Sequence, residues 1–151
     1  MGRNFGKWIG IAVMTAMFCV AGLVLSGEAQ ADRFINNGNG TVADTQTGLM
    51  WADKDNGSNI NWYSAKSYCE GYSGGGKSGW RMPTMDELRQ LYNSGAYGSV
   101  IQRSKTGRVC IWSSETSRSD AYCFDFLDGL WLRYPQSYDP SFRALPVRSG
   151  Q

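Results

Sequence analysis

The sequence predicts one α+β domain, in which two helices pack on small antiparallel sheets connected by long loops. Short extended runs joined by turn residues fill residues 33–52. Two stretches with helical periodicity follow at 62–72 and 84–92, and further strand-like runs occupy 109–148. Strands and helices that are segregated along the chain in this way are typical of α+β folds.

The first 31 residues have the pattern of a secretory signal peptide. Arg3 and Lys7 form a basic start, residues 8–25 are mostly apolar, and residues 29–31 read Ala-Gln-Ala, a small-x-small cleavage pattern. We expect cleavage after Ala31, which leaves residues 32–151 as a secreted, periplasmic or cell-surface domain. Because the apolar run is long, an uncleaved membrane anchor is the alternative.

The net charge and the lack of histidine exclude several kinds of function. Of the 15 basic and 13 acidic residues, Arg3, Lys7 and Glu28 precede the cleavage site, which leaves a net charge of +1. A nucleic-acid-binding protein would carry a strong excess of basic residues, so we do not expect this domain to bind nucleic acid. The chain has no histidine, the commonest metal ligand and general base. We therefore expect no metal, no cofactor and no catalytic triad.

Residues 33–52 predict a β-meander. Asn and Gly at 37–40 tolerate the positive φ angles of a tight hairpin turn, and 44–48 make a second turn. In the following loop, Asp53, Asp55 and Asn59 alternate like calcium ligands. However, Gly57 occupies the third ligand position and no glutamate closes the loop, so we predict a solvated loop without a metal.

The first helix is predicted from Trp62 to about Tyr72, with Asn61 as its N-cap. Ala65, Tyr68, Cys69 and Tyr72 recur at helical spacing and should form the buried stripe. The glycines at 74–76 end this helix. They do not form a phosphate-binding loop, because they follow a helix and do not precede one.

Residues 79–88 predict a strand that runs directly into a capped helix. Met82 precedes a proline, which favours extended backbone. Thr84 and Glu87 are spaced as a capping box. Leu88, Leu91 and Tyr92 give one apolar stripe, and residues 93–95 (Asn-Ser-Gly) are a stop signal.

The remaining chain predicts a second group of strands. Residues 109–114 and 121–126 should pair as a hairpin, followed by strands at 130–134 and 144–148. Trp80 and Trp112 are assigned to the core. Cys69, Cys110 and Cys123 remain after signal cleavage, and in an oxidising compartment one pair with one odd thiol is the simplest arrangement. We predict a Cys110–Cys123 disulfide across the hairpin.

Together these landmarks resemble a known family. The residues that carry the resemblance are 33–34, 37–42, 45–51, Trp62, Ala65, Tyr68, Cys69, 79–84, Glu87, Leu88, 112–114, Phe126, Gly129 and 146–148. They resemble the Lcl C-terminal domain family, which takes its name from a bacterial collagen-like adhesin and was formerly a domain of unknown function. The resemblance implies a C-type-lectin-like fold related to sulfatase-modifying enzymes, and binding of sulfated glycosaminoglycans in adhesion.

Two departures from related proteins matter. Many members of the family carry a cysteine near the C-terminus where this chain has Ser149, which weakens any disulfide role for Cys69. The sulfatase-modifying enzymes need a reactive cysteine pair late in the chain, and nothing after Cys123 supplies one. That activity is therefore not expected here.

The leading hypothesis is a secreted, non-enzymatic module that binds carbohydrate, since aromatic rings stack on sugars and dominate interfaces. Sulfated glycans would meet the basic loop at 102–108, and neutral glycans would meet the aromatic residues of the late loops. The candidate ligand-binding residues are Trp131, Arg133, Tyr134, Tyr138, Arg143, Arg103, Lys105 and Arg108.

Two alternatives stay open. The Tyr- and Ser-rich segment 135–142 also suits a docking surface for a surface-protein partner, in an envelope assembly role. An enzyme could pair carboxylates among Asp120, Asp125 and Asp128, as glycosidases do. Aspartate is common beside turns, however, so we predict no catalysis.

Overall fold

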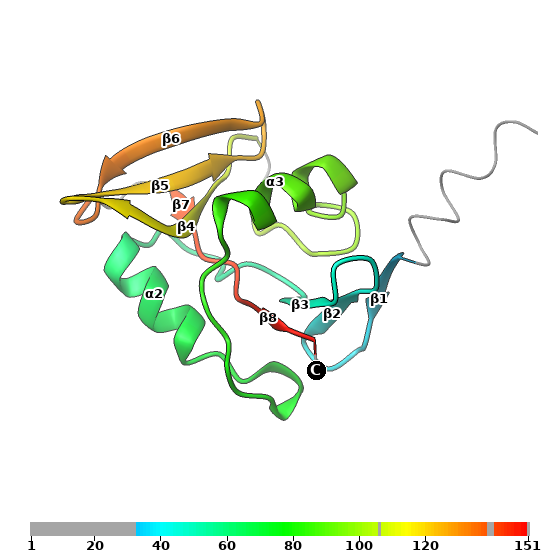
Figure 1. The fold of residues 1–151 in the computed structure, drawn as a ribbon. Coiled ribbons are helices and arrows are strands. Elements are labelled where there is room, and N and C mark those ends of the chain that lie inside the picture. The colour runs from blue at the N-terminus through cyan, green and yellow to red at the C-terminus, as the bar shows by residue number, and fades with distance from the viewer. Residues whose placement is uncertain (1–32, 106, 139–140, 151) are drawn as a thin grey trace, which may run out of the picture.

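The computed structural model describes residues 33–105, 107–138 and 141–150, which fold into two helices and two four-stranded sheets (Figure 1). The α+β class predicted from the sequence is thereby confirmed. The elements are β1 (Phe34–Asn36), β2 (Thr41–Asp44), β3 (Leu49–Ala52), α2 (Trp62–Glu70), the 3-10 turn η1 (Gly74–Gly76), α3 (Met85–Ser94), β4 (Cys110–Ser117), β5 (Asp120–Asp125), β6 (Leu130–Pro135), β7 (Phe142–Arg143) and β8 (Val147–Ser149). The predicted signal peptide and its cleavage site lie outside the described residues. Among the described helices, none has the length and apolar character that crossing a membrane requires.

The chain's last strands tie the two sheets together. The first sheet has the order β1-β2-β3-β8, so the predicted meander is confirmed and the C-terminal β8 closes it, with Val147 opposite Trp51. The second sheet has the order β6-β5-β4-β7, and β7 runs parallel to β4. Because β7 and β8 are three residues apart, the end of the chain holds both sheets in place.

Two predicted strands differ from the structure. The stretch before the second helix is extended, but only Arg81 pairs, in an isolated bridge to Val147. Of the predicted strand at 144–148, only Val147 and Arg148 lie in a strand, β8, because the backbone from Ala144 to Pro146 bonds elsewhere. The short strand β7 precedes the predicted strand, at Phe142–Arg143. The Ala144 carbonyl accepts from Asn56 and the Pro146 carbonyl from Ala52, while Pro146 has no N–H to donate to a sheet.

The helices are set by local chemistry. In α3, the Thr84 hydroxyl accepts from the Glu87 backbone and the Glu87 carboxylate accepts from the Thr84 backbone, so the capping box is confirmed. Gly95 ends this helix with φ +69°, a left-handed conformation that glycine adopts without strain. Helix α2 begins at Trp62 as predicted but ends at Glu70, two residues early. Tyr72 instead donates its hydroxyl to the Gly40 carbonyl at 2.6 Å.

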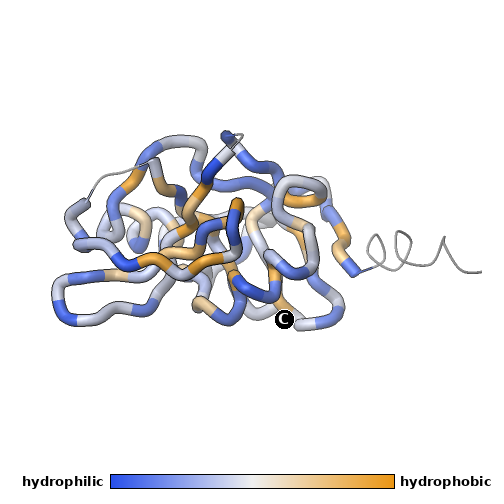
Figure 2. Tube along the Cα trace, turned by 90° about the horizontal axis from the view of Figure 1, so that it is seen from above, coloured by the Kyte–Doolittle hydropathy of each residue, from blue (hydrophilic) through white to orange (hydrophobic). Residues whose placement is uncertain are grey.

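The second sheet separates two apolar clusters. On one face, Leu88 and Leu91 of α3 pack with Ile111 and Phe124, and this cluster continues to Trp51 of the first sheet. On the other face, Ala65 and Cys69 of α2 pack with a cluster that includes Trp112 and Cys123. Figure 2 shows the apolar segments running through the interior and the hydrophilic ones following the outer loops. Trp80 and Trp112 are buried, as predicted.

The predicted Cys110–Cys123 disulfide is not formed in this structure, in which all three described cysteines are buried free thiols. The hairpin register explains why the expected geometry is wrong. Cys123 lies opposite Trp112 and Cys110 lies opposite Asp125, so the two cysteines are diagonal neighbours. A hydrogen bond to Cys110 and then burial raise the pKa of the Cys123 thiol, and burial raises the pKa of Cys69 to about 12. Protonated, buried thiols of this kind are unreactive.

We expect the domain to lose stability in acid through Glu87, which accepts two hydrogen bonds from the Arg81 guanidinium. Burial acts to raise the pKa of Glu87, but the bonds from Arg81 and Thr84 outweigh it and lower that pKa. A lowered folded-state pKa means that the stabilisation exists above the unfolded-state pKa and disappears as pH falls through the folded one. Wild type should therefore unfold at lower urea concentration near pH 3 than near pH 7.

The matched variant for this prediction is Glu87→Gln, because glutamine retains the capping box but carries no charge. Urea unfolding curves at both pH values should show a smaller pH-dependent loss in the variant than in wild type. An identical loss in both proteins would show that Glu87 does not contribute. Burial acts to raise the pKa of Asp44, but hydrogen bonds from Arg33 and Thr47 lower it, so Asp44 should add to the acid sensitivity of both proteins.

Candidate ligand-binding groove

A small groove opens between the start of α3 and strands β4, β5 and β6 of the second sheet. It has a volume of about 290 Å³. Its walls are made by Met85, Asp86, Glu115, Tyr122 and Trp131. These residues come from α3, β4, β5 and β6, so the groove exists only in the folded chain.

Trp131 is placed in the groove by the alternation of β6. It pairs with Phe124 of β5 and projects on the face that α3 covers, whereas Leu132 and Tyr134 pack on the opposite cluster. The ring is 52% exposed. Exposed large apolar side chains that gather at one place often mark a binding surface, and Trp131 adjoins a groove with a tyrosine in its wall.

Glu115 is held by the start of α3. Both carboxylate oxygens accept from the Met85 backbone N–H, at 3.0 and 2.9 Å. An irregularity in the β4–β5 pairing between Trp112 and Thr116 lies at this point of the strand. A carboxylate has about four acceptor sites, so Glu115 retains acceptor capacity toward the groove. The helix N-terminus fixes its position and stabilises its charge.

The groove is negative. Asp86 and Glu115 both line it, and no basic residue does. Asp86 is paired with Arg89 one helical turn later, at 2.6 Å. Sulfate or phosphate groups would be repelled by the carboxylates, whereas hydroxyl groups can donate to them. An apolar wall with a few fixed polar acceptors is the usual form of a small-molecule site.

The structure does not gather the predicted late-loop residues into one site. Trp131 lines the groove, and Arg133 lies on the same face of β6, paired with Asp120 at 3.3 Å. Tyr134 and Tyr138 stack on each other with centroids 5.3 Å apart, and Tyr134 packs on the other face of the sheet. Arg143 is only 6% exposed and donates hydrogen bonds to Ser104 and Asn59. It therefore stabilises the interior of the domain and is not available to a ligand.

The basic side chains of the predicted loop at 102–108 do not gather into one site either. Arg108 forms ion pairs with Asp125 and Asp128, across the β5–β6 turn. Arg103 lies beside Gly98 and Lys105 is exposed. These three cations are separate from the groove, none of whose wall residues belongs to the loop.

Sequence reasoning missed four of the five groove residues. Asp86 falls inside the predicted helix, and nothing in its sequence position marks it as a groove residue. Glu115 and Tyr122 come from strands whose relative register the sequence does not reveal, and Met85 was assigned only to the helix. The carboxylates considered for catalysis are engaged elsewhere, Asp120 with Arg133 and both Asp125 and Asp128 with Arg108. In the part of the chain that the structure describes, no three His, Cys, Asp or Glu side chains converge as a metal site requires.

One comparison with known proteins gives a match. The family model described as the Lcl C-terminal domain matches residues 40–148. This range spans every element from β2 to β7 and contains the whole groove. No curated protein matches the chain.

Proposed function

Since the chain belongs to the Lcl C-terminal domain family, we propose that it is a surface module that binds uncharged carbohydrate in the Trp131 groove. The family suggests a surface or adhesin-type module. The residues that line the groove favour an uncharged sugar. The basic start, apolar run and small-residue cleavage pattern of residues 1–31 support export of the module to the cell surface or beyond.

The observation that carries the proposal is the half-exposed Trp131 ring beside the fixed Glu115 carboxylate. The C–H face of a sugar ring is apolar and stacks on an aromatic ring, while its hydroxyls donate to acceptors at the edge. Strand β6 fixes the face of the sheet from which Trp131 projects, and the Met85 N–H holds the Glu115 carboxylate. Little ordering is therefore needed on binding, which favours affinity from a small contact.

Charge supports an uncharged ligand over a sulfated one. Arg108, Arg133 and Arg143 are engaged by protein groups, and the groove itself carries two carboxylates. Binding without catalysis fits the same picture, because Asp120, Asp125 and Asp128 are all ion-paired with arginines outside the groove.

Trp131→Ala is expected to weaken glycan binding at least about tenfold, because tryptophan anchors at binding sites commonly contribute about 2 kcal/mol or more. Leu130→Ala is the matched control. Leu130 is equally exposed, at 52%, and adjacent in β6, but it does not line the groove. The measurement is a glycan array, with neutral and sulfated glycans, probed at low and high salt with residues 32–151, which contain every described element.

Salt-tolerant binding of neutral glycans that is lost only in Trp131→Ala would support the proposal. Binding that is confined to sulfated glycans and weakens with salt would instead move the site to Arg103 and Lys105. If both variants bind like wild type, the groove is not the site.

A second candidate function is protein docking, in which the module assembles with another surface protein. Leu127, Leu130 and Trp131 are 53%, 52% and 52% exposed around the β5–β6 turn, and β6 is an edge strand of its sheet. Apolar residues next to an unpaired strand edge suit a protein partner. If no glycan on the array binds, protein docking is favoured. Leu130→Ala should then weaken binding of the protein partner as much as Trp131→Ala does.

A further inference from the structure

A second groove adjoins the Trp131 groove. It lies between α2 and the extended stretch before α3, has a volume of about 240 Å³, and is lined mainly by Trp62, Lys66, Arg81, Met82 and Ser114. Its buried wall is Met82, which is 4% exposed. Like the first groove, it combines one tryptophan with polar side chains at its rim.

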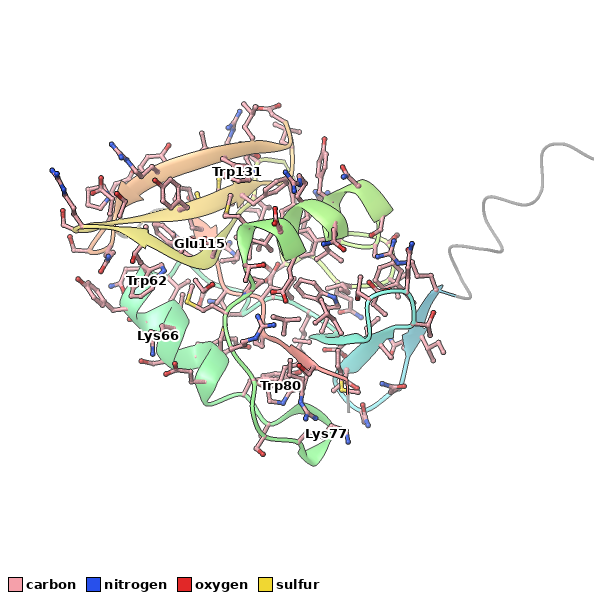
Figure 3. All side chains as sticks on the ribbon, in the orientation of Figure 1. Trp62, Lys66, Lys77, Trp80, Glu115 and Trp131 are labelled. Carbon is pink, nitrogen blue, oxygen red and sulfur yellow. The ribbon has the colours of Figure 1, made fainter. Side chains whose placement is uncertain are left out.

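The two grooves are separated by one ridge of backbone. Thr84 and Ser114 line the second groove, and the residues that follow them, Met85 and Glu115, line the first. The ridge is rigid because its two segments are bonded to each other. The Ser114 N–H donates to the Pro83 carbonyl at 2.8 Å, and the Met85 N–H donates to Glu115. Figure 3 shows Trp131, Glu115 and Trp62 following one another along the same side of the molecule.

Trp62 is held in a fixed orientation. Its indole N–H donates to the Ser113 carbonyl of β4 at 2.8 Å, and its ring meets Tyr63 edge to face with centroids 5.6 Å apart. Asn61 caps the helix directly before it by accepting from the Ser64 N–H. The ring packs only partly on the α2-side cluster, so part of its surface faces the groove.

The second groove carries no excess charge. Lys66 is paired with Glu70 one turn later in α2, and Arg81 is paired with Glu87 at 2.7 Å. The ends of these paired side chains can still exchange hydrogen bonds with hydroxyl groups. The chemistry therefore matches that of the first groove: an aromatic ring, an apolar wall and polar groups suited to an uncharged, hydroxyl-rich ligand.

We propose that the two grooves are subsites for one linear, uncharged oligosaccharide, with one sugar on Trp131, another on Trp62 and the chain crossing the ridge at Glu115. This inference rests on the proposed function. Strands β4 and β6 are two strand spacings apart, about 10 Å, and Trp62 lies beyond β4. A single sugar ring is too short to contact both tryptophans. Affinity should therefore depend on chain length.

The experiment is calorimetric titration of residues 32–151 with cello- and chito-oligosaccharides, from monomer to hexamer. Wild type is expected to bind the hexamer at least about tenfold more tightly than the dimer, because the second contact is made within one complex. Trp62→Ala should remove this gain and leave dimer affinity unchanged. Trp131→Ala should weaken binding at every length. Ile35→Ala is the control, since Ile35 of β1 is 49% exposed and lines neither groove.

Trp62→Ala could lose binding because it disturbs helix α2, so a second variant tests the groove without changing Trp62. Ser114→Arg fills the second groove from an exposed position and leaves Trp62 and its hydrogen bond in place. It should also remove the gain with chain length. Affinity that is independent of chain length, with both variants like wild type, would overturn the second subsite while the Trp131 site stands. Absence of binding at every length would overturn both proposals.

Discussion

Replacing Asp55 with alanine is expected to lower the free energy of unfolding by about 3–5 kcal/mol. Asp55 is 3% exposed. One carboxylate oxygen accepts from the Tyr97 hydroxyl at 2.6 Å and the Ser104 N–H at 2.9 Å, and the other accepts from the Gly57 N–H at 2.9 Å. The side chain therefore joins three parts of the chain, and its loss leaves buried donors without a partner.

Urea unfolding followed by tryptophan fluorescence measures this loss. Tyr97→Phe removes only one of the three bonds and should cost about 1–1.5 kcal/mol. Burial, then the charge of Asp55, raise the pKa of Tyr97, so its hydroxyl remains a donor at any ordinary pH. Asp53→Ala is the matched control two residues away. Its Oδ1 is buried without a hydrogen-bond partner among the described residues, so alanine removes an unsatisfied group and should not lower the free energy of unfolding. Equal losses in the Asp53 and Asp55 variants would contradict the prediction.

Asp55 also shows where sequence reasoning fails. The segment that contains Asp53, Asp55 and Asn59 was predicted to be a solvated loop, and for Asp55 this is wrong. Its partners Tyr97 and Ser104 are 42 and 49 residues away. Composition and spacing describe a residue's neighbours in the chain, and a polar residue that is buried by distant partners has no local signature.

The features that were predicted correctly depend on short-range chemistry. The capping box of α3 involves groups three residues apart, and the first hairpin turn of the meander needs only Asn and Gly in sequence. The same contrast holds for the groove. Trp131 was found because a tryptophan among late-loop residues is conspicuous by its type alone. Glu115 was not found, because its role depends on contact between β4 and the start of α3, 30 residues earlier.

Trp112→Ala is expected to cost about 3–5 kcal/mol, a large fraction of the 5–15 kcal/mol that typically stabilises a domain. Trp112 is fully buried at the centre of the α2-side cluster, and its ring meets Phe142 edge to face with centroids 4.9 Å apart. Its indole N–H donates to the Ile60 carbonyl at 2.8 Å. Alanine would leave a cavity and also an unpaired carbonyl, so the two penalties add.

Trp112→Phe separates these penalties and links the core to binding. Phenylalanine retains most of the ring packing and should cost about 1–2 kcal/mol less than alanine. The Ile60 carbonyl still loses its donor, and Ile60 directly precedes the Asn61 cap and Trp62. We therefore expect Trp112→Phe to reduce the affinity gained from long oligosaccharides while dimer binding at Trp131 is unchanged.

Urea unfolding curves test the expected loss of stability, and the oligosaccharide titration tests the expected loss of the chain-length gain. Equal destabilisation by alanine and phenylalanine would show that ring packing contributes little, and an intact chain-length gain would show that Trp62 is positioned without this hydrogen bond.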